Sequence, residues 1–111
     1  MTRHVEVHVT AGTREETERI VDAVVGSRVA AGAQISGPIV STYWWQGEIQ
    51  RSEEYLILMK TVTARLDELI MVVREVHSYE TPEIVAVPIE GGLADYLDWI
   101  TEETAVSAKG E

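Results

Sequence analysis

The stretch that decides the fold is Ile39-Val40-Ser41-Thr42-Tyr43-Trp44-Trp45-Gln46-Gly47-Glu48-Ile49-Gln50. The residues before the turn are mostly β-branched or aromatic, which is typical of a strand. Gln46-Gly47 then supplies the positive-φ residue that a tight turn requires. A return strand starts at Glu48 and ends in the apolar run Tyr55-Leu56-Ile57-Leu58-Met59. The sequence therefore predicts two long antiparallel strands joined by a short turn.

Two irregularities are expected in this hairpin. The charged run Arg51-Ser52-Glu53-Glu54 interrupts the return strand, and we interpret it as a β-bulge. Pro38 has no amide hydrogen, so it must lie at a strand start, at a sheet edge or at a bulge. At about 3.3 Å per residue, the arms are long enough to extend beyond the body of a small domain.

On the N-terminal side of the hairpin, the sequence predicts a strand and a helix. Polar residues alternate with valines over His4–Val9, which indicates a strand with one buried face. Thr13 and Glu16 have the spacing of a capping box, in which Thr13 accepts from a free amide and Glu16 reaches back. The helix that follows has apolar residues at helical spacing, and Gly32 is the expected stop. The residues that carry this spacing are Ile20, Val21, Val24, Arg28 and Val29.

On the C-terminal side, a helix, a strand and a second helix are expected. The helix begins after Thr63 and ends before Pro82, because its apolar residues recur at steps of three and four. The strand Glu83–Ile89 is almost continuously apolar, which favours a central position with both faces covered. A third helix follows Gly91-Gly92.

The order of these elements is β-α-β-β-α-β followed by a helix. This α+β order is typical of a ferredoxin-like fold, in which both main helices cover one face of an antiparallel sheet. The other sheet face and the long hairpin are left without a partner in one chain, so self-association is expected. We predict a single domain over residues 1–104 and a flexible tail over residues 105–111, which is small and polar.

Composition excludes several classes of protein. The chain has 111 residues, a net charge of −10, two lysines and no cysteine. Thiolate metal sites and disulfides are therefore excluded, and nucleic acid is an unfavourable partner for so acidic a surface. No apolar run has the length of a membrane span, and no secretory signal is expected. We expect a cytoplasmic protein with no membrane partner.

The chain resembles the CutA family of divalent-cation tolerance proteins over nearly its whole length. The resemblance is carried by Val29-Ala30-Ala31-Gly32-Ala33-Gln34, Ser41-Thr42-Tyr43-Trp44-Trp45-Gln46-Gly47, Leu56-Ile57-Leu58-Met59-Lys60-Thr61, His77-Ser78-Tyr79-Glu80-Thr81-Pro82-Glu83-Ile84 and Tyr96-Leu97-Asp98-Trp99. It implies a ferredoxin-like homotrimer in the cytoplasm, with hairpins that pair across subunits and a role linked to copper and other divalent metals.

The chain departs from the family at three positions. The family commonly has Cys where this chain has Gly32, Asn where it has Gln34, and often Pro where it has Ser78. Without that cysteine the chain lacks the soft ligand suited to Cu(I). A divalent metal such as copper or zinc must then be held by histidine, carboxylate or backbone oxygen, and no organic cofactor is implied.

His77 is the centre of the main candidate site. In one interpretation it faces a pocket near subunit interfaces, and imidazole plus carboxylate there suits Cu(II) or Zn. A lysine among these groups could instead hold a small anionic molecule. In the other interpretation, His77 caps the helix and bonds a buried carbonyl. The candidate binding residues are Lys60, His77, Tyr79, Glu80, Glu83 and Trp45, of which His77 and Glu80 are candidate metal ligands.

His4, Glu6 and His8 are weaker candidate metal ligands on one face of the first strand. One ion could bridge Glu6 to either histidine, but His4 and His8 are about 13 Å apart and cannot share an ion within one subunit. Ordinary polar residues on a non-core face are the simpler interpretation. Near a threefold axis, however, one histidine per chain would make a three-nitrogen site.

Three functions remain open. The favoured one is a homotrimeric CutA-like protein that binds metal and is not an enzyme. The second is a trimeric small-molecule sensor similar to PII proteins, against which the acidic charge and the tight turn both count. The third is an enzyme that uses Lys60, His77 and Glu80 in an inter-subunit cleft. No nucleophile–base arrangement stands out, so no catalytic residue is predicted.

Trp44 and Trp45 are successive residues of the predicted strand, so their side chains point to opposite faces of it. At least one of them is therefore expected to be exposed, as an anchor in a subunit interface or as a platform on which a ligand stacks.

Overall fold

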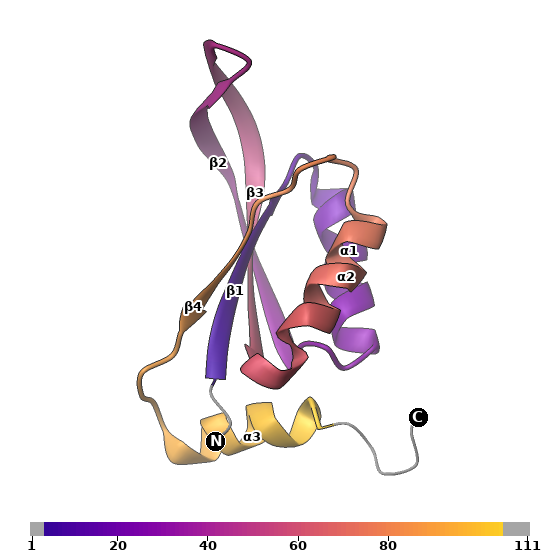
Figure 1. The fold of residues 1–111 in the computed structure, drawn as a ribbon, viewed down its shortest axis with the longest axis vertical. Coiled ribbons are helices and arrows are strands. Elements are labelled where there is room, and N and C mark those ends of the chain that lie inside the picture. The colour runs from indigo at the N-terminus through magenta and orange to yellow at the C-terminus, as the bar shows by residue number, and fades with distance from the viewer. Residues whose placement is uncertain (1–3, 106–111) are drawn as a thin grey trace.

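A computed structural model describes residues 4–105, which form a four-stranded antiparallel sheet with two helices on one face (Figure 1). The elements in chain order are β1 (His4–Ala11), α1 (Arg14–Gly26), β2 (Gly32–Trp45), β3 (Glu48–Val62), a short 3-10 helix (Thr63–Arg65), α2 (Leu66–Val76), β4 (Ile84–Pro88) and α3 (Ala94–Glu103). The strand order is β2-β3-β1-β4. The predicted ferredoxin-like order with a terminal helix is confirmed.

The core lies between the sheet and the helices α1 and α2. Val5, Val7 and Val9 point into it from β1, while the polar residues between them lie on the opposite sheet face. From β3, Ile57 and Met59 are fully buried on the same side. The face that α1 and α2 leave uncovered is called the open face below (Figure 1). The predicted alternation in the first strand is therefore confirmed.

The β2–β3 hairpin projects beyond the rest of the molecule (Figure 1), which measures 47 × 29 × 22 Å. Gln46 and Gly47 both adopt positive φ, at 51° and 82°, and this is the twist that a two-residue hairpin turn needs. The pairing runs without a break from Ile39 opposite Glu54 to Trp45 opposite Glu48. The length and turn of the hairpin are as predicted.

The predicted bulge at Arg51–Glu54 is wrong. The break in register lies instead between Ser36 and Ile39 on the other strand, where Gly37 has a φ of 141° and Pro38 follows. Pro38 cannot donate to a ladder and Gly37 tolerates a backbone that other residues avoid, so the irregularity forms there. Arg51–Glu54 pairs regularly with the opposite strand, because Arg51 and Glu53 are exposed to solvent and Glu54 accepts a hydrogen bond from Tyr79.

The first helix ends earlier than predicted, at Gly26 rather than Gly32, and Gly32 is the first residue of β2. The Ser27 hydroxyl donates to the carbonyl of Ala23 at 2.7 Å, and Arg28 takes a φ of 64°. These two residues turn the chain out of the helix. The apolar pattern ran past the true end because the turn folds Val29 back into the core, where it is buried.

The central position predicted for the last strand is also wrong, because β4 lies at an edge of the sheet beside β1. Val85 and Val87 are 50% and 42% exposed on the open face. Their pairing partners there are His8 and Glu6. An apolar run indicates coverage of both faces, but in a single chain one face of β4 has no cover.

No helix among residues 4–105 has both the length and the apolar composition that a membrane span requires. Most of the tail predicted over residues 105–111 lies outside the described residues, which end at position 105.

Candidate functional site

His77 follows directly after α2 and is buried against the end of β1. Its Nε2 donates to the carbonyl oxygen of Thr10 at 2.7 Å, and its Nδ1 accepts from the amide of Tyr79 at 3.1 Å. A carbonyl only accepts and an amide only donates, so these two bonds assign the neutral tautomer with the proton on Nε2. Both ring nitrogens are engaged, and the residue holds the chain after α2 against β1.

Glu16 completes this buried network from the first turn of α1. Its Oε2 accepts from the Ser78 amide at 2.5 Å and lies 3.5 Å from His77 Nδ1. Burial alone would raise the pKa of Glu16, but the hydrogen bonding from Ser78 outweighs it, so the pKa is lowered. Thr13 accepts from the Glu16 amide at 3.1 Å, as predicted. The reciprocal half of the capping box is not made, because the Glu16 side chain bonds Ser78 instead.

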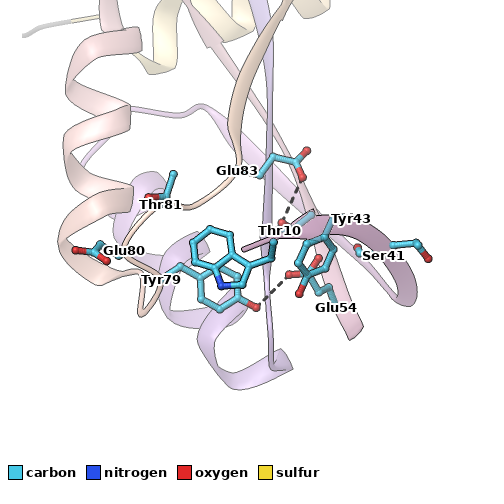
Figure 2. A pocket seen from close by; sticks show the side chains of 10 residues that line it. Thr10, Ser41, Tyr43, Glu54, Tyr79, Glu80, Thr81 and Glu83 are labelled. Carbon is cyan, nitrogen blue, oxygen red and sulfur yellow. Dashed lines mark hydrogen bonds between the residues drawn. The ribbon is translucent and has the colours of Figure 1, made fainter. Parts of the chain in front are cut away.

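Tyr79 is positioned by this network and points at Glu54 of β3 (Figure 2). Its ring lies 4.7 Å from the His77 ring between centroids, and its hydroxyl donates to Glu54 Oε2 at 3.0 Å. Partial burial raises the pKa of Tyr79 to about 12, and the hydrogen bond to Glu54 and the charge of that carboxylate act in the same direction. The hydroxyl therefore stays protonated at neutral pH and donates to Glu54.

A pocket of about 570 Å³ opens beside Tyr79, where the hairpin leaves the body of the molecule. Figure 2 shows the hydroxyl of Tyr79 directed at Glu54 and the side chain of Glu83 directed at Thr10, while Glu80 lies apart from both pairs. The Thr10 hydroxyl is 3.5 Å from Glu83 Oε1. The pocket, called the hairpin-root pocket below, is lined by Thr10, Ser41, Thr42, Tyr43, Trp45, Glu54, Tyr79, Glu80, Thr81 and Glu83.

The pocket brings together four of the six predicted binding residues: Trp45, Tyr79, Glu80 and Glu83. Sequence reasoning missed Tyr43 and Glu54, among others. A signal for Glu54 was present: it is separated from Leu56, Leu58 and Lys60 by steps of two, which places it on the open face of β3.

Lys60 lies elsewhere on the open face, about 20 Å along β3 from Glu54. Its Nζ is 3.5 Å from Glu6 Oε1 and 3.5 Å from Gln34 Oε1. His77 lies behind Tyr79 and is not among the lining residues of the pocket. Within one chain, therefore, Lys60 and His77 do not line a common pocket.

The polar residues of β1 form two separate contacts on the open face. His8 Nε2 donates to Glu6 Oε2 at 2.8 Å, whereas His4 Nε2 lies 2.9 Å from the Thr101 hydroxyl on α3. The bond from His8 lowers the pKa of Glu6 against the opposing effect of burial, and Lys60 lowers it further. Within residues 4–105, no three histidine or carboxylate side chains are grouped to hold one metal ion.

The family model for CutA1 divalent ion tolerance proteins matches residues 5–103. The divalent-cation tolerance protein CutA of Archaeoglobus fulgidus is 40% identical over 99 residues, which cover 89% of this chain and 96% of that protein. The protein of the same name from Thermus thermophilus is 41% identical over 98 residues, covering 88% and 95% of the two chains.

Solved structures of such proteins share the fold. The crystal structure of CutA1 from Oryza sativa has a TM-score of 0.91 at 35% identity, with 95% of this chain and 96% of that chain covered. The Archaeoglobus fulgidus structure, described as a periplasmic divalent cation tolerance protein, has a TM-score of 0.88 at 39% identity and covers 92% and 99%. The chain spans only 57% of the length of the chloroplastic rice relative, Protein CutA 1, with which it shares 37% identity over 101 residues, or 91% of this chain.

We expect Glu16→Gln to lower the free energy of unfolding at pH 7 by about 1–3 kcal/mol, because the Ser78 amide loses a charged acceptor. The folded-state pKa of Glu16 is lowered from 4.5, so its contribution is complete above that pH and is lost as the pH falls through the folded value. Urea unfolding of wild type and variant from pH 7 to pH 3 should therefore give curves that converge on the acid side.

Glu15→Gln is the matched control, since Glu15 is exposed one residue away. It should change stability by less than about 0.5 kcal/mol at every pH. A difference between wild type and Glu16→Gln that stays constant across the range would contradict the role assigned to the Glu16 carboxylate.

Proposed function

The chain belongs to the CutA1 divalent ion tolerance family, and we propose that it acts in the cytoplasm as a homotrimer that binds divalent cations. The observation that carries this proposal is the open face. It combines exposed apolar side chains on β4 with an imidazole–carboxylate pair on β1, so one surface offers both an interface and metal-ligating groups.

Self-association is supported by the distribution of apolar surface. Val85 and Val87 are exposed on an edge strand, where unpaired backbone groups also lie. The projecting hairpin carries more exposed apolar side chains, among them Val40, Trp44 and Ile49. Large apolar groups on a projecting arm and a bare sheet face are both typical of interfaces. If the hairpin of one copy packs against the open face of the next, it covers the apolar groups of the hairpin and those of the open face together. The resemblance to the CutA family implies that three copies assemble in this way.

The groups best placed to bind a divalent cation are Glu6 and His8. Two close imidazole–carboxylate pairs are found within residues 4–105, His77 with Glu16 and His8 with Glu6. In the first pair both ring nitrogens already bond the backbone, so a metal could bind only if buried hydrogen bonds broke. The second pair is partly exposed on the open face. Imidazole and carboxylate together suit Zn(II) and Cu(II), with water or other copies supplying the remaining ligands.

Lys60 opposes a cation at this position, because its Nζ lies 3.5 Å from Glu6 Oε1. A divalent ion bound to Glu6 and His8 takes over the role of Lys60 as the counter-charge. Cation binding and the Lys60–Glu6 ion pair therefore compete.

The assembly is tested by the mass of the native protein in solution. Light scattering should give three times the chain mass of 12.3 kDa. Val87→Asp places a charge on the open face and should give the mass of a single chain. Met71→Asp is the control, since Met71 is 62% exposed on α2 and should leave the mass unchanged. A wild-type protein with the mass of one chain would rule out the trimer.

Metal binding is tested by calorimetry with Zn(II) and Cu(II). His8→Ala should weaken binding at least about tenfold, because an imidazole ligand is lost. His4→Ala should leave it unchanged, since His4 bonds Thr101 away from Glu6. Lys60→Met should strengthen binding by removing the competing charge. Equal affinities for wild type and His8→Ala would show that the ion binds elsewhere.

A further inference from the structure

Glu54 is a buried carboxylate without a cationic partner in the part of the chain that the structure describes. Glu54 is only 6% exposed, and none of the ion pairs formed by residues 4–105 includes it. The Tyr79 hydroxyl bonds Oε2, but this neutral donor leaves the charge without a counter-charge. Buried carboxylates in folded proteins are normally paired with a cation or a metal. The missing positive charge therefore points to something that enters the hairpin-root pocket.

The wall around Glu54 is aromatic. Tyr43, Trp45 and Tyr79 line the pocket together with this carboxylate. The Tyr43 hydroxyl lies 3.1 Å from the Ser52 hydroxyl, which holds that ring on the hairpin. Aromatic faces attract organic cations, and the attraction grows when the site excludes water. The volume of about 570 Å³ is in the range of small-molecule sites.

The same wall disfavours other ligands. An anion would meet Glu54, Glu80 and Glu83 with no lysine, arginine or histidine among the described lining residues. This argues against the small anionic ligand expected when Lys60 was placed in the cleft. Zn(II) and Cu(II) favour imidazole ligands, and no histidine is among the described lining residues of this pocket.

We propose that the hairpin-root pocket binds a small organic cation, with its ammonium group against Glu54 and its apolar part against Trp45 and Tyr43. The site shares no residue with the Glu6–His8 pair, and the inference does not depend on metal binding. It gives the chain a small-molecule ligand, as in the sensor function that the sequence left open.

The probe for this proposal is benzylammonium, which combines an ammonium group with an aromatic ring. Binding to the native full-length protein is followed by the NMR signal of the Trp45 indole N–H and by calorimetry. Benzylammonium should bind saturably and shift the Trp45 signal. Benzyl alcohol, without the charge, should bind at least about tenfold more weakly, and phenylacetate, with the opposite charge, should not bind.

Glu54→Gln keeps an acceptor for Tyr79 and removes only the charge, so it should weaken benzylammonium binding at least about tenfold. The control is Glu53→Gln, an equal change of charge at an exposed residue next along β3. It should leave the affinity unchanged. Equal binding of benzylammonium and benzyl alcohol, or equal losses in the two variants, would overturn the proposal.

A lysine or arginine from another copy could supply the same positive charge, and the oligomer mass separates this source from a free ligand. If Glu54→Gln lowers the native mass while benzylammonium fails to bind the wild type, the cation is a side chain of a second copy and the small-molecule site is wrong. If the mass is unchanged and benzylammonium binds, the ligand is free. Loss of Zn(II) binding in His8→Ala has no bearing on either result.

Discussion

The hydrogen bond from His77 Nε2 to the Thr10 carbonyl is the constraint on which the site depends. It ties the chain after α2 to the end of β1, and the Glu16–Ser78 bond ties the same chain to α1. These two anchors fix the successive residues His77 and Ser78, and the next residue, Tyr79, then reaches Glu54 on β3. A buried imidazole used in this way positions Tyr79 in the pocket wall, while hydrogen bonds to the backbone engage both of its ring nitrogens.

The fold could be predicted because local patterns in the chain agree with one another. The valine alternation in β1, the Thr13 cap and the Gln46-Gly47 turn each specify one backbone arrangement, and each is found. The errors arose where the composition of a segment does not specify what packs against it. The apolar sequence of β4 predicts a strand covered on both faces, and it does not say whether a helix or another copy provides the cover. The charged run on β3 suggests an interruption of the strand, although regular pairing accommodates it.

The site was predicted only in part, because spacing along a strand says which face a residue occupies but not what lies across from it. Trp45, Tyr79, Glu80 and Glu83 were identified by their motifs, and the structure gathers them. Glu54 was treated as part of a charged run, but it is buried and accepts a hydrogen bond from Tyr79, a residue distant in the sequence. His77 fits a metal ligand by residue type, yet its two backbone hydrogen bonds place it in the framework.

We propose that His77 holds Tyr79 in place beside the hairpin-root pocket, while divalent cations bind at Glu6 and His8. The most direct test is the ¹⁵N NMR spectrum of the histidine rings during titration with Zn(II). We predict that His77 shows the neutral tautomer with its proton on Nε2 before and after metal is added, whereas the His8 signals shift. A His77 ring that carries its proton on Nδ1, or that shifts with Zn(II) while His8 does not, would contradict this account.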